Sequence, residues 1–244
     1  MARPKRREPV IEHATKPVAP PKDVDRRIAR AHTRHPESLR EEAYEAIKLR
    51  IITCALKPGD YVNELQLSAL LEIGRTPVHQ ALERLTLEGM VDIIPHKGAI
   101  VRPFRLNEVL QIAEARSINE IHCARLAAER ATNRNIAALE DVLAQTKHWA
   151  SLRNVEKLVL LDRAFHRELA SAARNDALAE LLRGLHERSL RFWFVSHGAP
   201  DQHDRMRRQH EAILAAVRKC DPKEAEAAMR AHMESLRQNI AALL

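Results

Sequence analysis

Apolar residues recur with a helical period soon after the N-terminal segment ends. The stretch that starts at Ser38 predicts a helix, with Ser38 as N-cap and Glu41 three residues later completing a capping box. A short helix is expected from Asn63. A further helix is expected after Thr76, which is a favourable N-cap followed by Pro77 at the first helical position.

The pattern then changes from a helical period to two short apolar runs. The segment MVDIIPHKGAIVRPF, residues 90–104, predicts two β-strands joined by a turn at residues 95–98. Three helices followed by a β-hairpin is the order of elements in a winged helix-turn-helix. Residues 38–104 are therefore predicted to form a domain of this type.

From residue 105 to the C-terminus the apolar positions are helical throughout. Gly, Asn and Pro residues divide this region into segments of typical helix length. The expected helices are 106–131, 135–151, 155–174, 176–197, 201–219 and 222–242. Helices joined by such short connections form a bundle, so the fold class is mainly α, with a winged helix-turn-helix followed by a six-helix domain over residues 105–244.

Charge adds a third region. The chain of 244 residues has a formal net charge of +7, and residues 1–37 hold ten Lys or Arg against five Asp or Glu. This segment is rich in Pro and has no apolar period, so we interpret it as a disordered basic tail. Such a tail would strengthen attraction to DNA phosphates; the alternative is a segment without a role.

The cysteines and the hydropathy exclude several classes of protein. The three cysteines are widely spaced and form no CxxC pair, so a disulfide framework or a cysteine zinc ribbon is not expected. No apolar run approaches the roughly 20 residues that cross a bilayer. A cytoplasmic protein associated with the nucleoid is expected, with double-stranded DNA as its partner.

The second helix of a helix-turn-helix enters the major groove, where residues at its N-terminus reach base edges. Here these residues are Arg75, Thr76 and His79. Lys97 and Gly98, at the hairpin tip, are expected beside the minor groove or the backbone, Lys97 for its charge and Gly98 for close approach.

The motifs of this domain resemble the GntR family of bacterial transcriptional regulators. A PG turn, E-x-x-L, R-T-P-V, A-L-x-x-L, E-G-x-V and K-G-A-x-V occur in that order. The chain differs from the family's usual G-V-S-R at residues 72–75 and from its usual Arg-Glu at His79 and Gln80. The resemblance implies DNA binding, whereas the differences argue against the family's usual operator sequence.

An unusual acid–imidazole pair lies in the segment LLDRAFHRELA, residues 160–170. On a helical wheel Asp162 and His166 share the apolar face, and a buried carboxylate is costly unless it is paired or bound to metal. His210 and His232 also lie on apolar faces. The four side chains suit a divalent metal such as Zn, Ni or Mn, although separate hydrogen-bonded core histidines remain the alternative.

Residues 106–242 resemble the FCD domain, the helical partner domain of the FadR-type GntR subfamily. The resemblance rests on D-x-x-x-H with A-x-x-N-x-x-L, on Q-H-x-A-I-L and on M-R-x-H. It implies Asp162, His166, His210 and His232 as metal ligands. It also implies a small organic-acid or sugar-acid effector beside the metal, with Arg116 as its anchor. The alternative for Arg116 is a core ion pair with Glu120 or Asp162.

These features predict a homodimeric regulator on a two-fold operator, with the effector controlling DNA affinity. Repression with effector-induced release is the commoner arrangement in the family. One alternative is a metal sensor, in which the cation itself is the signal. A helical metalloenzyme is not expected, since Glu168 and Glu211 lie on outer faces. The other histidines, among them His186 and His203, are expected at the surface or in the tail.

Overall fold

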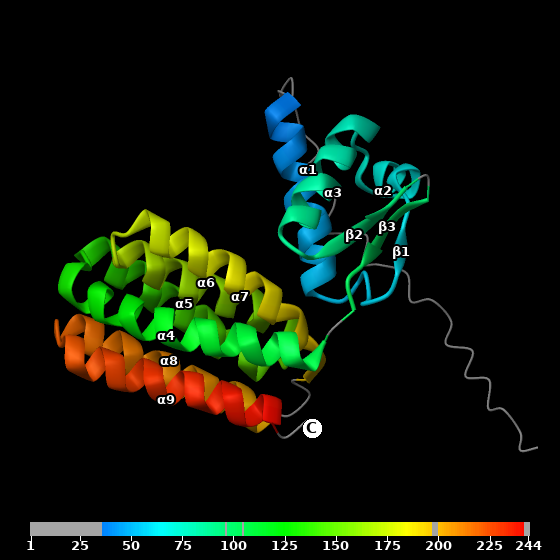
Figure 1. The fold of residues 1–244 in the computed structure, drawn as a ribbon. Helices are drawn as coiled ribbons and strands as arrows, with labels where there is room; N and C mark the ends of the chain where they lie inside the picture. The colour runs from blue at the N-terminus through cyan, green and yellow to red at the C-terminus, as the bar shows by residue number, and fades with distance from the viewer. Residues whose placement is uncertain (1–35, 96, 104, 197–199, 242–244) are drawn as a thin grey trace, which may run out of the picture. The chain divides into compact units, whose positions relative to one another are not determined.

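The structure is a computed structural model that describes residues 36–95, 97–103, 105–196 and 200–241. The predicted basic tail therefore lies almost wholly outside the described residues, which from Pro36 onward belong to one compact unit. The elements, in chain order, are α1 Pro36–Ile52, β1 Tyr61–Val62, α2 Glu64–Leu71, α3 Arg75–Leu87, β2 Val91–Ile94, β3 Gly98–Val101, α4 Leu106–Arg130, α5 Asn133–Ser151, α6 Val155–Ala172, α7 Asp176–Ser196, α8 Pro200–Arg218 and α9 Pro222–Ala241. Figure 1 shows them in this order along the colour bar.

The first three helices and the sheet form the predicted winged helix-turn-helix. The sheet is antiparallel with strand order β1-β3-β2. The hairpin of β2 and β3 is confirmed, whereas β1 was not expected, because two residues are too few to show a period. A continuous core lies between the helices and the sheet; its largest buried side chains include Tyr44, Ile47, Leu82, Leu85 and Met90.

Two predicted helix starts are wrong and one is confirmed. α3 begins at Arg75 with Gly74 as N-cap, so Thr76 is not the cap. α1 begins at Pro36, upstream of the predicted capping box at Ser38. Proline fits anywhere in a first turn, because the N–H groups there have no intrahelical partner, so Pro77 did not fix the start of α3. At α2 the Asn63 side chain accepts a hydrogen bond from the Leu65 N–H, as an N-cap does.

Gly98 has a structural reason to be glycine. Its φ is +108°, and a Cβ at this position would lie 2.5 Å from the carbonyl oxygen of Val62. The residue therefore allows β1 to approach β3 closely. This requirement exists without DNA, so the presence of glycine here does not by itself indicate a nucleic-acid contact.

The region after residue 105 is the predicted helical bundle. Each of the expected helices is present, with ends within two residues of those predicted. α4 packs against α9, α5 against α6, and α8 against α9, and these helices run side by side in Figure 1. Their shared core includes Leu139, Phe165, Ile213, Val217 and Met229. Within the described residues, no helix combines the length and apolar character that a membrane span requires.

Candidate metal centre and DNA-contacting residues

Asp162 and His166 lie on the buried face of α6, as the helical wheel predicted. Each is 6% exposed, and Phe165 beside them is fully buried. The segment folds as a helix because Asn154 caps its N-terminus and its apolar positions recur every three or four residues. The helix therefore carries a carboxylate and an imidazole into the core of the bundle.

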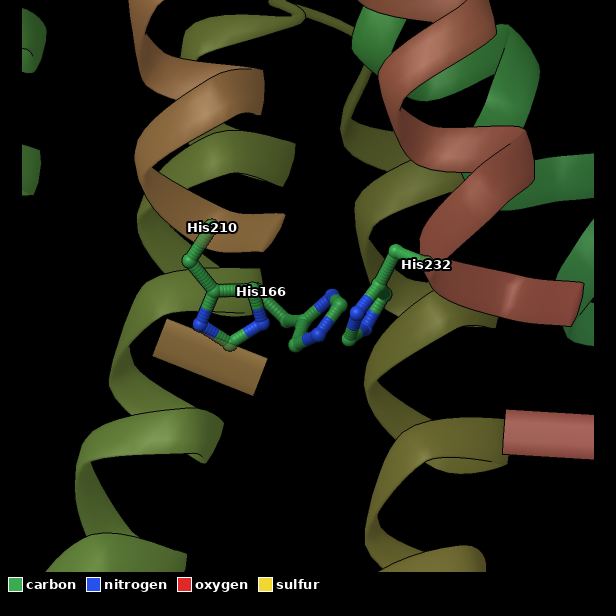
Figure 2. A group of neighbouring side chains, drawn as sticks. All are labelled: His166, His210 and His232. Atoms are coloured by element: carbon green, nitrogen blue, oxygen red, sulfur yellow. The ribbon is translucent and has the colours of Figure 1, made fainter. Parts of the chain in front are cut away.

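His210 on α8 and His232 on α9 meet His166 in the same place. Figure 2 shows the three imidazoles gathered between the helices that carry them. One nitrogen of each ring lies within 4.8 Å of one nitrogen of the others. Asp162 Oδ1 is 3.6 Å from His210 Nε2 and 3.9 Å from His166 Nε2. We call Asp162, His166, His210 and His232 the histidine cluster.

Hydrogen bonds fix which nitrogens of the histidine cluster face its centre. The Nδ1–H of His166 donates to Glu120 Oε2 over 2.6 Å, since an ionised carboxylate can only accept. His232 Nδ1 lies 3.1 Å from the amide oxygen of Gln209. In both rings the Nε2 lone pair is left available. Partners of this kind orient the imidazole ligands of protein metal sites.

Two nitrogens of the histidine cluster are buried without a hydrogen-bond partner among the described residues. They are His166 Nε2 and His210 Nε2. The His210 ring is held by stacking on Phe165, with centroids 4.0 Å apart and planes 8° from parallel. A buried polar atom without a partner costs about 1–3 kcal/mol. Two such atoms beside a carboxylate are the arrangement that a cation would satisfy.

The protonation states suit a cation as well. Burial, with a smaller contribution from the neighbouring His166, lowers the pKa of His232 to about 3. Burial also lowers the pKa of His210 well below its usual range. Burial alone would raise the pKa of Asp162, but the hydrogen bond from His186 and the neighbouring imidazoles hold it well below its usual range. A neutral His210, a neutral His232 and an ionised Asp162 are the forms of these three groups that bind metals.

The prediction that His186 is a surface residue is wrong. This side chain on α7 is 3% exposed, and its Nε2–H donates to Asp162 Oδ2 over 3.1 Å. His203, also expected at the surface, is 8% exposed. The sequence did contain a sign that His186 is buried, because it lies four residues from Leu182 and four from Leu190, and both leucines are buried. His186, Asp162 and His166 form a second triad of closely spaced atoms, but the His186 nitrogen is committed to Asp162.

Arg116 is buried on α4, and the core ion pair considered from the sequence is present. Its Nε and Nη2 donate to Glu120 Oε1 over 2.9 and 2.7 Å, and its Nη1 donates to Ser189 over 2.8 Å. Glu120 thereby links Arg116 to His166. Burial would raise the pKa of Glu120, but His166 and Arg116 hold it well below its usual range. Arg116 also lines a cavity of about 30 Å³ with three members of the histidine cluster, so its role as an effector anchor stays a prediction.

The residues predicted to contact DNA lie at the surface of the winged domain. Arg75, Thr76 and Lys97 are exposed. His79 is 49% exposed, and its Nδ1 lies 2.8 Å from Glu64 Oε1 and its Nε2 3.4 Å from Glu83 Oε1. The hydrogen bond with Glu64 raises the pKa of His79. Two acidic neighbours make His79 a weaker candidate for a phosphate contact than Arg75. The base contacts themselves stay predictions.

Two family models match the chain. The model described as bacterial regulatory proteins, gntR family, matches residues 39–101. The model described as FCD domain matches residues 111–235 and so contains the whole histidine cluster together with Arg116.

Similar proteins are named as transcriptional regulators. The chain is 33% identical to the Nta operon transcriptional regulator of Aminobacter aminovorans, over 73% of this chain and 83% of that protein. It is 30% identical to the HTH-type transcriptional regulator LutR of Bacillus subtilis, over 74% of this chain and 91% of that protein. The fold is similar to that of Escherichia coli McbR/YncC, with a TM-score of 0.77, 20% identity and coverage of 84% and 98%.

Proposed function

The chain belongs to the GntR family of bacterial regulators and carries an FCD domain, and on that premise we propose that a small carboxylate bound beside a divalent metal controls its affinity for operator DNA. The matches to known proteins show that the chain is a GntR-type transcriptional regulator. The metal, the effector, the homodimer and the direction of control are the proposal.

One observation carries the proposal. His166 Nε2 and His210 Nε2 are buried beside Asp162 and have no hydrogen-bond partner among the described residues. A cluster that served packing alone would be expected to satisfy these atoms. Asp162, His166, His210 and His232 would hold the metal, which would supply a Lewis-acidic position for a carboxylate oxygen.

The cavity beside the histidine cluster supports a carboxylate as the effector. Its lining includes the guanidinium of Arg116, whose Nη1 donates to the neutral hydroxyl of Ser189. A carboxylate is a stronger acceptor for this group than a hydroxyl. In the proposal the effector takes over that hydrogen bond, while Glu120 keeps Arg116 and His166 in place.

A connection from the histidine cluster toward the DNA-binding domain supports control of operator affinity. Arg163, next to Asp162, forms ion pairs with Glu45 of α1 at 3.2 Å and with Glu187 of α7 at 2.6 Å. A shift of α6 or α7 on effector binding would change these contacts. In a homodimer on a two-fold operator it would change the arrangement of the two recognition helices. The proposed direction is repression with release by the effector.

Metal content is the first test. We expect close to one equivalent of divalent metal in protein purified without added metal, measured by elemental mass spectrometry. The His210→Ala variant should lose it, and the His148→Ala variant, which changes an exposed histidine, should keep it. Less than about a tenth of an equivalent in the wild type, with unchanged stability of His210→Ala, would refute the metal site.

Operator binding is the second test. Arg75→Ala should abolish specific footprints, since one good base contact is worth about 1–3 kcal/mol. Arg134→Ala removes an exposed charge from α5 instead and should leave the footprints unchanged. A carboxylate that releases wild-type protein but not Arg116→Ala from DNA supports the effector site. Release by a chelator alone, with no response to any acid, would favour the metal-sensor alternative.

A further inference from the structure

The cavity beside the histidine cluster has a polar lining beyond Arg116. α8 supplies Gln202, Arg205 and Gln209, and α9 supplies Ser235 and Asn239. Met206 and Leu236 add apolar surface. The cavity thus presents a second cation and several hydrogen-bonding groups, and none of these side chains is a metal ligand in the proposed function.

The cavity is small. Its volume of about 30 Å³ compares with roughly 10–15 Å³ for one water measured in the same way. A six-carbon sugar acid does not fit this space without rearrangement; a separate cavity of about 520 Å³ is lined by Glu120, His166 and His186 but not by Arg116. A short acid, with its far end at the mouth, is the ligand that requires the least movement of the helices.

Arg205 is a cation without an acidic partner in the part of the chain that the structure describes. Arg207, two residues away, pairs with Asp204 at 3.6 Å and with Glu211 at 2.5 Å. Arg116 is committed to Glu120. Of the two arginines that line the cavity, Arg205 is the one without an ion pair among the side chains that the structure describes, and it is exposed, as expected of a group at the mouth.

Gln202 adds a second unsatisfied group. Its side-chain oxygen is buried and has no hydrogen-bond partner among the described residues. The neighbouring Gln209 differs, because its amide oxygen accepts from His232. A buried amide oxygen that lines a cavity requires a donor, and a hydroxyl group on a ligand supplies one.

The geometry points to a short hydroxy dicarboxylate as the effector. One carboxylate lies beside the histidine cluster and Arg116, the second carboxylate pairs with Arg205 at the mouth, and the hydroxyl donates to Gln202. This inference rests on the proposed function, from which it takes the first carboxylate. It adds a second anion subsite at Arg205 and a contact between the ligand hydroxyl and Gln202.

A matched pair of acids tests the second subsite. Malate and 3-hydroxybutyrate differ by one carboxylate in place of a methyl group, and both are titrated calorimetrically into the metal-loaded full chain. We expect malate to bind about fivefold more tightly, the effect of one partly solvated ion pair. In Arg205→Gln this preference should disappear through weaker binding of malate. Arg208→Gln, which removes an exposed charge of the same helix, should keep the preference.

Succinate tests the hydroxyl. It lacks only the hydroxyl of malate, so wild-type protein should favour malate, and Gln202→Leu should remove that difference. Equal binding of malate and 3-hydroxybutyrate by the wild type, or an unchanged ratio in Arg205→Gln, would overturn the inference and leave the proposed function standing. Absence of binding by all three acids would refute both.

Discussion

Two clusters of buried ionisable side chains in this protein differ in how their polar atoms are satisfied. In the first, Lys48 of α1 is fully buried and contacts Tyr44, Glu88 and Glu187. We call these four residues the lysine cluster. The second is the histidine cluster, in which two imidazole nitrogens have no hydrogen-bond partner among the described residues.

In the lysine cluster, Glu88 Oε2 and Glu187 Oε2 are also buried without a hydrogen-bond partner among the described residues, but each forms an ion pair with the Lys48 ammonium. Tyr44 donates to Glu88 over 2.7 Å, Lys48 pairs with Glu88 at 2.9 Å, and Arg163 pairs with Glu187 at 2.6 Å. Each charge has a partner, as a buried charge requires. Buried atoms without a hydrogen bond therefore occur in both clusters. What distinguishes the histidine cluster is the cation: among the described residues, Asp162 pairs with histidines only and with no lysine or arginine.

The largest predicted effect is on the lysine cluster. Lys48→Met removes the buried cation that Glu88 and Glu187 share. The cations left to them are less buried, among them Arg84 and Arg163. Removal of one partner of a buried pair costs about 3–5 kcal/mol. Urea denaturation should show this loss with and without a chelator. Lys147→Met, at an exposed position of α5, should change the free energy of unfolding by less than about 0.5 kcal/mol. Similar small losses in both variants would contradict the comparison.

Metal removal should act on the histidine cluster next. At a free metal concentration of about a hundred times Kd, binding stabilises the folded state by about 2.7 kcal/mol. A chelator should abolish this gain in the wild type, and metal should restore it. His232→Ala should not respond to either treatment, whereas Lys147→Met should respond like the wild type. If the stability of the wild type changes with neither chelator nor metal, the histidine cluster is a structural cluster like the lysine cluster and binds no metal.

His186 should affect metal affinity without being a ligand. Its hydrogen bond to Asp162 orients the carboxylate, and loss of such partners lowers metal affinity about 10–100-fold. His186→Leu should show this loss in a competition titration with a chromogenic chelator. His186→Gln keeps an N–H donor and should recover part of the affinity. Wild-type affinity in His186→Leu, with a lower melting temperature of the metal-free protein, would instead indicate a packing role.

The smallest predicted effect is a pH dependence in the lysine cluster. Burial opposes ionisation of Glu88, but the hydrogen bonds from Tyr44 and Lys48 outweigh it and lower its pKa. A lowered pKa contributes stability that is present above the unfolded value of about 4.3 and lost as the pH falls through the folded value. Between pH 5 and the acid limit of folding, Glu88→Gln should therefore lose less stability than the wild type in urea titrations. Parallel curves would contradict this assignment.

Much of the candidate site was predictable because its members follow local patterns. Asp162, His166, His210 and His232 each lie at an apolar position of a regular helix, and the structure buries all four. His186 follows the same pattern between Leu182 and Leu190 but was predicted at the surface. It has no motif of the family resemblance around it, and its reason for burial, the bond to Asp162, joins residues 24 positions apart.

Local patterns in the sequence were enough to predict the order of the helices and of the β2–β3 hairpin, the ends of most helices and the faces they bury. Helical period, capping and turn residues act over a few neighbouring positions, whereas β1 depends on its pairing with the distant β3. Which polar atoms find partners depends on the tertiary structure. Only it showed that Arg116 is held by Glu120 and Ser189, that Lys48 pairs with Glu88 and Glu187, and that Gly98 makes room for Val62. These outcomes depend on contacts between distant parts of the chain, and a pattern of single positions does not specify which atoms will meet there.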